Sequence, residues 1–410
     1  MMKQKLLDRF LTYVKVYTPS DENSGASPST PYQFDLAHLL EEEMKQMGIS
    51  DVLVDENCYV YGQIPASVGC ENAPAIGFIA HLDTVSDCCS KPCTPLVHEN
   101  YDGKDIALDA GGITIRVKDF PHLAKMKGRT LITSDGTTVL GADDKAGIAV
   151  ILSMAEELLK SDVPHGKICI AFTPDEEIGS GAGLLDLRRF GADFGYTIDG
   201  DLEGGLEYET FNAASAKITV KGVNVHPGSA KDIMVNAAAI ACELQGMLPA
   251  KEQPAYTEGY EGFFHLTNIS GEVEKAQLHY IIRDHDRAKF EERKKLILSV
   301  CDQLNAKYGE GTVSADVSDS YYNMAEVLKD HMHLVEHAKK AIEETGLMAD
   351  IKPVRGGTDG SQLSFRGLPC PNLGAGGAGF HGPYEHISLE GMELSVRVVL
   401  EIVRSYAEDR

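Results

Sequence analysis

Three apolar segments of this chain are followed by histidine or acidic residues, and this pattern constrains the fold most strongly. The segments with the residues that follow them are 75–80 before His81, 167–172 before Glu176 and Glu177, and 195–198 before Asp199. A short continuous apolar run is typical of a strand buried on both faces of a parallel sheet. Open α/β sheets carry their chemistry at the carboxyl ends of such strands. The sequence therefore predicts an α/β fold with a polar site at one edge of its central sheet.

The adjacent pair Glu176 and Glu177 lies between the second of these strands and the glycines Gly179 and Gly181. Two neighbouring carboxylates at the end of a buried strand need a cation, a proton or solvent to offset their repulsion. An ordinary solvated acidic turn would also explain the pair, because acidic residues usually lie on exposed faces. The rest of the chain decides between these two interpretations.

His81 and Asp83 follow the first strand in the sequence His-Leu-Asp-Thr. In an extended segment their side chains point to the same side, because side chains alternate with a period of two. This arrangement suits an imidazole ligand with a supporting carboxylate, or a carboxylate that assists a catalytic base. A capping aspartate beside a surface histidine is the alternative.

Asp143 and Asp144 precede a helix that the Ala-, Ile-, Leu- and Glu-rich composition predicts at residues 146–159. The helix dipole stabilises negative charge near a helix N-terminus. Simple capping would explain one of the two aspartates and explains a second less readily.

Histidine and carboxylate residues at these positions form one candidate ligand set, to which the segment 379–386 after a glycine-rich loop adds an imidazole. The set is His81, Asp143, Glu177, Asp199 and His381. Nitrogen and oxygen ligands without thiolate suit two Zn²⁺ ions, or Mn²⁺ or Co²⁺, with one carboxylate bridging the pair. Two such ions would polarise a carbonyl and lower the pKa of a shared water to about 7. Glu176 would then be free to accept a proton and deliver it to a leaving amine.

The charge and cysteine content limit the possible partners and the compartment. With 38 basic and 62 acidic residues, the formal charge of −24 argues against a nucleic-acid or anionic-membrane partner. No apolar run reaches the roughly 18 residues of a membrane helix, and the first residues lack the apolar core of a signal peptide. Nine cysteines, an odd number, indicate reduced thiols. We expect a soluble cytoplasmic protein.

Cys88, Cys89 and Cys93 form the only local cluster of cysteines. A soft metal site there would be an alternative use of these residues. It lacks a fourth cysteine or histidine at the spacing of a zinc ribbon or finger, and His98 is the only nearby candidate.

Residues 209–321 show a different pattern, with the order β-α-β-β-α-β. The expected strands and helices are 216–220, 232–247, 262–270, 276–284, 287–308 and 312–317. This order fits a small ferredoxin-like α+β domain inserted into the main domain. The sequence thus predicts a catalytic domain in two parts, residues 1–208 and 322–410, with the insert between them.

Several motifs spread over essentially the whole chain resemble the peptidase T family. They are HLDT at 81–84, GADDKAG at 141–147, PDEEIGSG at 174–181, TIDGD at 197–201, GVNVHPGSAK at 222–231, PVRGGTDGSQLSFRGLPCPN at 353–372 and FHGPYEHISLEGME at 380–393. These are tripeptide aminopeptidases of the di-zinc family that includes carboxypeptidase G2-like and acetylornithine deacetylase-like enzymes. The resemblance implies a mixed-sheet zinc-peptidase domain with a lid and dimerisation domain inserted.

The resemblance also implies a role for each site residue. One zinc would be held by His81 and Asp199, the other by Glu177 and His381, with Asp143 bridging them, Glu176 as general base and Asp83 as its neighbouring orienter. Asp144 departs locally, since peptidase T often has asparagine there. Relatives also place the lid histidine, here His226 before Pro227 and Gly228, in the active site of the partner subunit.

His226 could stabilise the tetrahedral oxyanion if a homodimer brings it over the metals. A turn histidine with a solvated ring is the alternative. The free carboxylate of a tripeptide calls for a cationic or amide receptor, for which Arg283, Arg355 and Asn323 are candidates. Arg283 and Asn323 could equally be structural, and Arg355 is favoured because glycines follow it.

The leading prediction is a zinc aminopeptidase that removes the N-terminal residue of small peptide substrates, specifically tripeptides. A related amidohydrolase, deacylase or dipeptidase is the alternative within the enzymes. A non-catalytic metal- or peptide-binding homologue is the alternative outside them. A non-catalytic homologue is expected to lack the catalytic base or a metal ligand, whereas all seven positions hold residues that can serve the proposed roles.

Overall fold

The computed structural model describes residues 2–408 of the chain and separates into two compact units. Within the described residues, the first comprises 2–208, Val327–Lys352 and 358–408, and the second comprises Glu209–Glu326 and Pro353–Gly357. The chain therefore passes from one unit to the other four times.

A mixed eight-stranded sheet forms the centre of the first unit. In spatial order its strands are β1 (Ser50–Val54), β2 (Val60–Ile64), β8 (Ile168–Thr173), β3 (Ile76–His81), β9 (Phe194–Gly200), β16 (Asn372–Gly374), β10 (Gly205–Glu207) and β15 (Asp350–Ile351). The four central strands β8, β3, β9 and β16 run parallel, and the strands on either side of them, β2 and β10, pair with them antiparallel. Every residue of β3 and β8 is buried, as the continuous apolar runs predict. The α/β prediction is confirmed.

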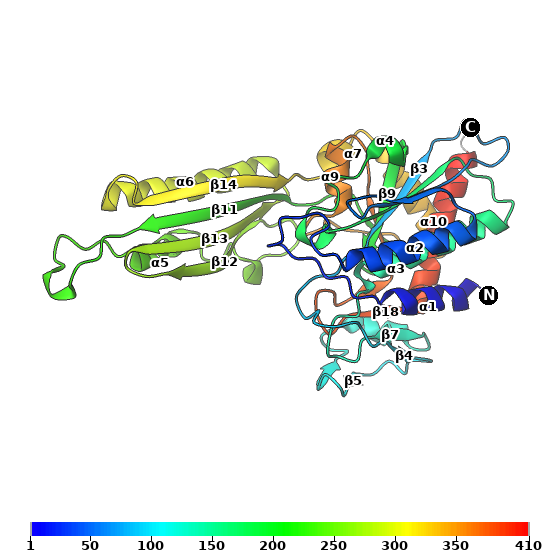
Figure 1. Ribbon diagram of the computed structural model, residues 1–410, viewed down its shortest axis with the longest axis horizontal. Coiled ribbons are helices and arrows are strands. Elements are labelled where there is room, and N and C mark those ends of the chain that lie inside the picture. Colours follow the sequence, from blue (N-terminus) through cyan, green and yellow to red (C-terminus); the bar gives the residue numbers. More distant parts are fainter. Residues whose placement is uncertain (1, 409–410) are drawn as a thin grey trace. The chain divides into compact units, whose positions relative to one another are not determined.

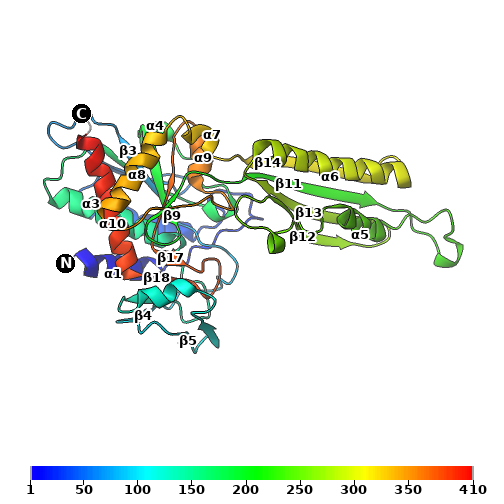
Figure 2. The ribbon, with the colours of Figure 1, turned by 180° about the vertical axis from the view of Figure 1, so that it is seen from behind.

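Helices cover this sheet and one another in the first unit. They are α1 (Met2–Tyr13), α2 (Gln33–Met47), α3 (Ala142–Lys160), α4 (Leu187–Phe190), α8 (Met332–Glu344), α9 (Asp359–Phe365) and α10 (Leu389–Glu408), with α7 (Ala325–Leu328) at a passage between units. Helix α3 packs on β3 and β9, and α10 packs on both α3 and α8 (Figures 1 and 2). None of the helices within residues 2–408 is long and apolar enough to cross a membrane.

Segments far apart in the sequence meet in a second, smaller sheet of this unit. Its strands, in spatial order, are β17 (Gly377–Ala378), β18 (His386–Ser388), β7 (Leu131–Thr133) and β4 (Leu96–His98), and a hairpin of β5 (Ile106–Leu108) and β6 (Ile113–Ile115) accompanies it. The pairing of β18 with β7 fixes the C-terminal end of the loop that carries His381. The 3-10 helix η1 (Pro121–Met126) follows the hairpin in the chain.

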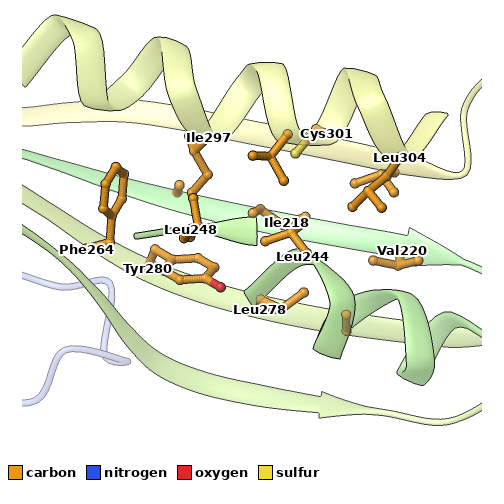
Figure 3. Close-up of a cluster of buried hydrophobic side chains, with 14 of the residues drawn as sticks. Ile218, Val220, Leu244, Leu248, Phe264, Leu278, Tyr280, Ile297, Cys301 and Leu304 are labelled. Carbon is orange, nitrogen blue, oxygen red and sulfur yellow. The ribbon is translucent and has the colours of Figure 1, made fainter. Parts of the chain in front are cut away.

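The second unit is a four-stranded antiparallel sheet with two helices. Its spatial order is β12 (Phe263–Gly271), β13 (Lys275–Asp284), β11 (Asn212–Lys221) and β14 (Val313–Tyr321), with helices α5 (Ala237–Met247) and α6 (Arg287–Tyr308). Alternate residues of β13 are buried, and these pack with the helices in one apolar core (Figure 3). The chain order and spatial order confirm the predicted ferredoxin-like fold.

Helix α5 begins later than the residue 232 that the sequence pattern indicated. Its first residue is Ala237, because Asn236 caps it: the Asn236 side-chain oxygen accepts a hydrogen bond from the Ala239 N–H at 3.1 Å. Asp232 lies in the left-handed region with φ of 63°, which is incompatible with a helix.

The second unit also extends past the insert boundary that we predicted at residue 321. Asn323 accepts a hydrogen bond from the Thr210 N–H at 2.9 Å and donates its own N–H to Asn212 at 3.0 Å. The segment Pro353–Gly357 belongs to this unit as well, since the Val354 N–H donates to the Glu209 carbonyl at 2.8 Å. That these units are a catalytic domain and a lid stays a prediction.

Candidate metal centre

The candidate site begins where β3 and β8 end together. In the parallel register of these strands His81 lies beside Thr173, so both strands end at the same edge of the sheet. Asp199 is the next-to-last residue of the neighbouring strand β9. The parallel sheet thus brings residues distant in sequence to one place, as expected at the carboxyl edge of an α/β sheet.

The first group of potential metal ligands is His81, Asp143 and Asp199. His81 Nε2 lies 2.9 Å from Asp143 Oδ1 and 3.5 Å from Asp199 Oδ1. The His81 side chain is 2% exposed, so its ring is held in place by packing. These three donor atoms are close enough to converge on one cation.

The second group is Asp143, Glu177 and His381. His381 Nε2 lies 3.2 Å from Asp143 Oδ2 and 3.1 Å from Glu177 Oε2. Asp143 belongs to both groups and faces each with a different carboxylate oxygen. That is the arrangement a bridging carboxylate requires.

The electrostatics of these groups fit a divalent cation. Burial raises the pKa of Glu177 and of Asp199 to about 7, and Asp143 adds to the shift for Glu177. Hydrogen bonds to Asp143 and Glu177 raise the pKa of His381 to about 11. Carboxylates crowded together in a buried place repel one another, and a cation among them would remove that repulsion. Two imidazoles and three carboxylates without thiolate form a donor set that zinc, manganese or cobalt accepts.

Asp83 connects His81 to the glutamate pair. Its Oδ1 lies 3.3 Å from His81 Nδ1 and accepts the Glu176 N–H at 3.0 Å, while its Oδ2 accepts the Glu177 N–H at 3.2 Å. His81 and Asp83 thus point to the same side, as their spacing predicts. Asp83 fixes the backbone of both glutamates as well as the ring of His81.

Glu176 lies beside the two ligand groups and belongs to neither. Burial, followed by the nearby Asp199, raises the pKa of its carboxyl well above the ordinary value. A carboxylate in such surroundings has an increased tendency to accept a proton. The residue before it, Asp175, has a φ of 59° in the left-handed region, and this conformation turns the chain sharply after β8.

Asp175 is a supporting residue that the sequence analysis did not single out. The carboxylate accepts the Ser29 N–H at 2.8 Å and the Gln33 Nε2–H at 2.6 Å. It thereby ties the loop before α2 to the start of the glutamate pair. The only sequence signal was a third acidic residue in the run Asp175-Glu176-Glu177.

Asp359 and Glu385 are two further buried carboxylates that sequence reasoning missed. Asp359, at the start of α9, accepts the Thr173 hydroxyl at 2.6 Å, and a Cβ on Gly181 would lie 2.4 Å from its Oδ1. Glu385 accepts the Gly141 N–H at 2.8 Å and the Asp143 N–H at 3.0 Å, and burial raises its pKa to about 7. No local pattern indicates these partners, because they lie far away in the sequence.

Regular helical geometry in α3 begins after the two aspartates. Asp143 and Asp144 have non-helical backbone angles, and the peptide bond between them is cis. The Asp144 carboxylate accepts the His81 N–H at 3.2 Å and the Gly147 N–H at 3.1 Å. Asp144 therefore caps the helix and anchors β3, which explains the second aspartate of the pair.

The predicted residues of the second unit are held by contacts within that unit. His226 is exposed and accepts the Gly228 N–H at its Nδ1. Arg283 donates to the carbonyls of Ala214 at 3.3 Å and Ile282 at 3.1 Å. The structure therefore brings none of these side chains into either metal-ligand group.

Arg355 and Asn323 also have local partners. The Arg355 guanidinium donates to the carbonyls of Gly259 at 2.7 Å and Glu261 at 2.9 Å, and it lies over the ring of Phe211. Asn323 is buried, and its Nδ2 donates to the His285 carbonyl at 3.2 Å. Substrate binding by these residues stays a prediction.

The cysteine cluster takes no part in the candidate site. Cys88 is exposed, while Cys89 and Cys93 are buried. Within residues 2–408, neither candidate ligand group includes a cysteine, and His98 Nε2 faces the Thr133 hydroxyl at 3.0 Å instead.

Comparison with known proteins agrees with this geometry. The family model described as peptidase family M20/M25/M40 matches residues 140–405. The chain belongs to this family. Among M20 relatives it is 53% identical over 408 residues to Peptidase T of Alkaliphilus oremlandii, covering 99% of this chain and 100% of that protein. It is 49% identical over 407 residues to Peptidase T of Bacillus subtilis, covering 99% of each.

Solved structures of M20 relatives share the fold. Aminopeptidase PepT from Bacillus cereus matches with a TM-score of 0.78 at 22% identity, and a tripeptidase from Staphylococcus aureus with 0.79 at 24%, each over 99% of both chains. A dinuclear metal-binding peptidase of the M20 family from Bacillus subtilis matches with a TM-score of 0.65 at 14% identity, over 100% of this chain and 99% of that one. These structures show the M20 peptidase fold, and the family match together with the full-length relatives shows that the chain is an enzyme.

Proposed function

We propose that this enzyme is a metallo-aminopeptidase that removes the N-terminal residue from tripeptides. One observation carries the proposal: two groups of potential ligands share Asp143, and Glu176 lies beside them outside both groups. Full-length relatives named Peptidase T, and solved relatives titled aminopeptidase and tripeptidase, support the substrate class.

Two zinc ions per subunit, with manganese or cobalt as alternatives, are the cofactors that we propose. His81 and Asp199 would hold one ion, Glu177 and His381 the other, and Asp143 both. Cations at this place supply two things: they polarise a peptide carbonyl and lower the pKa of a water molecule. Proton transfer and substrate recognition are assigned to side chains of the enzyme.

Glu176 is the proposed general base. Its carboxylate accepts a proton from the attacking water and returns it to the amine that leaves. The raised pKa of this group supports that role, because burial and the neighbouring Asp199 increase the affinity of the Glu176 carboxylate for a proton. Asp83 orients the pair, since it holds the backbone N–H groups of both Glu176 and Glu177.

Recognition of the substrate is proposed to involve the inserted domain, residues 209–321. His226 would stabilise the oxyanion in the partner subunit of a homodimer. Arg283, Arg355 and Asn323 are the proposed receptors for the substrate carboxylate. Arg283 is the one we favour, because its hydrogen bonds to backbone carbonyls of its unit, at 3.3 and 3.1 Å, are longer than those of Arg355, at 2.7 and 2.9 Å, and because Asn323 is buried. The cytoplasm is the proposed compartment, on the composition of the chain.

The test is hydrolysis by metal-free protein reconstituted with Zn²⁺, Mn²⁺ or Co²⁺. We expect Ala-Ala-Ala to be cleaved at its first peptide bond, faster than Ala-Ala or a tetrapeptide and with no cleavage of N-acetylalanine. Equal rates on all three lengths would overturn the tripeptide proposal. Cleavage of N-acetyl amino acids in preference would identify a deacylase instead, and absence of any hydrolysis would favour a non-catalytic homologue.

A further inference from the structure

The loop that carries His381 approaches Asp143 twice. At its beginning, His381 Nε2 lies 3.2 Å from Asp143 Oδ2. At its end, Glu385 accepts the Asp143 N–H with Oε1 at 3.0 Å and the Gly141 N–H with Oε2 at 2.8 Å. One loop thus contacts both the side chain and the backbone of the residue shared by the two ligand groups.

The backbone before regular α3 needs such an acceptor from elsewhere. Asp144 caps the regular part of α3, so the N–H groups of Gly141 and Asp143 lie before it, on backbone that is not helical. A buried N–H without an acceptor is costly, and Gly141, with a φ of 76°, has no side chain that could supply one. The two oxygens of Glu385 satisfy both N–H groups, and its side chain is 1% exposed.

A buried carboxylate at the position of Glu385 is destabilising unless its charge or its two acceptor oxygens contribute something that an uncharged side chain cannot. Glu385 lies near the negative charge of Asp143, and buried like charges repel. Two charge-assisted hydrogen bonds from backbone N–H groups offset part of this cost. They also hold the backbone of Asp143, whose side chain faces His81 with one carboxylate oxygen and His381 with the other.

We propose that Glu385 is a positioning residue for the metal centre, which holds Asp143 so that its two carboxylate oxygens face the two ligand groups. The inference rests on the proposed function, because it concerns the shared ligand. It assigns no contact between Glu385 and a cation or a substrate. Partners that orient metal ligands typically contribute about 10–100-fold to metal affinity.

The experiment compares the unmodified chain with Glu385→Gln, which keeps the shape but replaces one acceptor oxygen by a donor. Metal-free proteins are titrated with Co²⁺, and calorimetry gives the affinity and the number of ions while visible absorption reports ligand geometry. We expect Glu385→Gln to weaken binding about 10–100-fold and to change the Co²⁺ spectrum.

The matched control is Glu390→Gln. Glu390 also accepts a backbone N–H, that of Thr130 at 2.8 Å, and pairs with Lys3, but it belongs to neither ligand group. We expect this variant to bind Co²⁺ as the unmodified chain does. A purely structural role for Glu385 would lower the melting temperature of the metal-free variant and leave the Co²⁺ affinity and spectrum unchanged, which would overturn the inference.

Two further outcomes are distinguishable. If the unmodified chain bound no cation, the proposed function would fail and this inference with it; if it bound Co²⁺ and folded Glu385→Gln bound it equally, only this inference would fail. Should Glu385→Gln not fold, Glu385→Asp provides the test, because a carboxylate one methylene shorter cannot reach both N–H groups. The same loss of affinity is expected for it, and unchanged affinity would overturn the inference.

Discussion

The two units of the chain differ in how some of their polar side chains are arranged. In the first unit the carboxylates of Asp143, Glu177 and Asp199 gather in one place, where burial raises the pKa of the latter two. In the second unit Asn323 and Arg355 bond to backbone groups nearby, around a regular apolar core. Carboxylates collected against their own repulsion indicate a cation site, whereas locally satisfied polar groups indicate a scaffold.

The largest expected effect tests the first side of this comparison. Glu176→Gln removes the proposed proton acceptor without removing a ligand, so kcat on Ala-Ala-Ala should fall about 10²–10⁴-fold while metal content stays the same. Metal analysis of the purified variant accompanies the rate measurement. Glu177→Gln is the matched neighbour, and it should lose metal affinity. Full activity of Glu176→Gln would exclude the base role.

The next effect tests whether the second unit is an independent scaffold. Leu278 is fully buried in its core, and Leu278→Ala should cost about 2–5 kcal/mol of the free energy of unfolding of that unit. Hydrogen exchange of the amides of β11 and β13 in increasing urea measures the loss. Metal affinity should not change. A parallel decrease in metal affinity would show that the two units are not separable in this way.

Metal removal provides the converse test. A cation that binds only the folded first unit stabilises it by about 2.7 kcal/mol when its free concentration is 100 times the Kd. Adding a chelator should therefore increase hydrogen exchange in α3, which begins beside Asp143, and leave the exchange of α6 in the second unit unaltered. Equal loss of protection in both helices would contradict the comparison.

The smallest effect concerns Arg355. Arg355→Lys keeps the charge but cannot reproduce the planar guanidinium, whose Nη1 bonds the carbonyls of Gly259 and Glu261 while its Nη2 bonds the Thr257 hydroxyl, so the second unit should lose about 1 kcal/mol of stability. The KM for Ala-Ala-Ala should stay nearly constant. If KM instead rises strongly while stability is unchanged, Arg355 binds the substrate carboxylate after all.

Much of the fold could be predicted because its signals are local. Continuous apolar runs identified β3 and β8, and the β-α-β-β-α-β order identified the ferredoxin-like unit. The same runs located His81, Asp83 and Asp199, since the residues after parallel strands share one edge of the sheet. The division of labour between Glu176 and Glu177 came from family resemblance and stays a prediction.

The supporting residues could not be predicted from local pattern. Glu385 bonds a backbone 242 residues away, and Asp175 bonds a side chain 142 residues away. Such partners depend on tertiary contacts that no periodicity encodes. The extent of the second unit escaped prediction for the same reason, because the short segment around Val354 carries no signal of its partner at Glu209.

The interrupted path of the chain has a practical consequence for engineering. Because Pro353–Gly357 belongs to the second unit, a chimera that replaces only Glu209–Glu326 would leave Arg355 from one parent against Gly259 from the other. A graft between relatives should therefore transfer both stretches together. Two separate pieces of DNA, rather than one cassette, encode what behaves as a single transferable module.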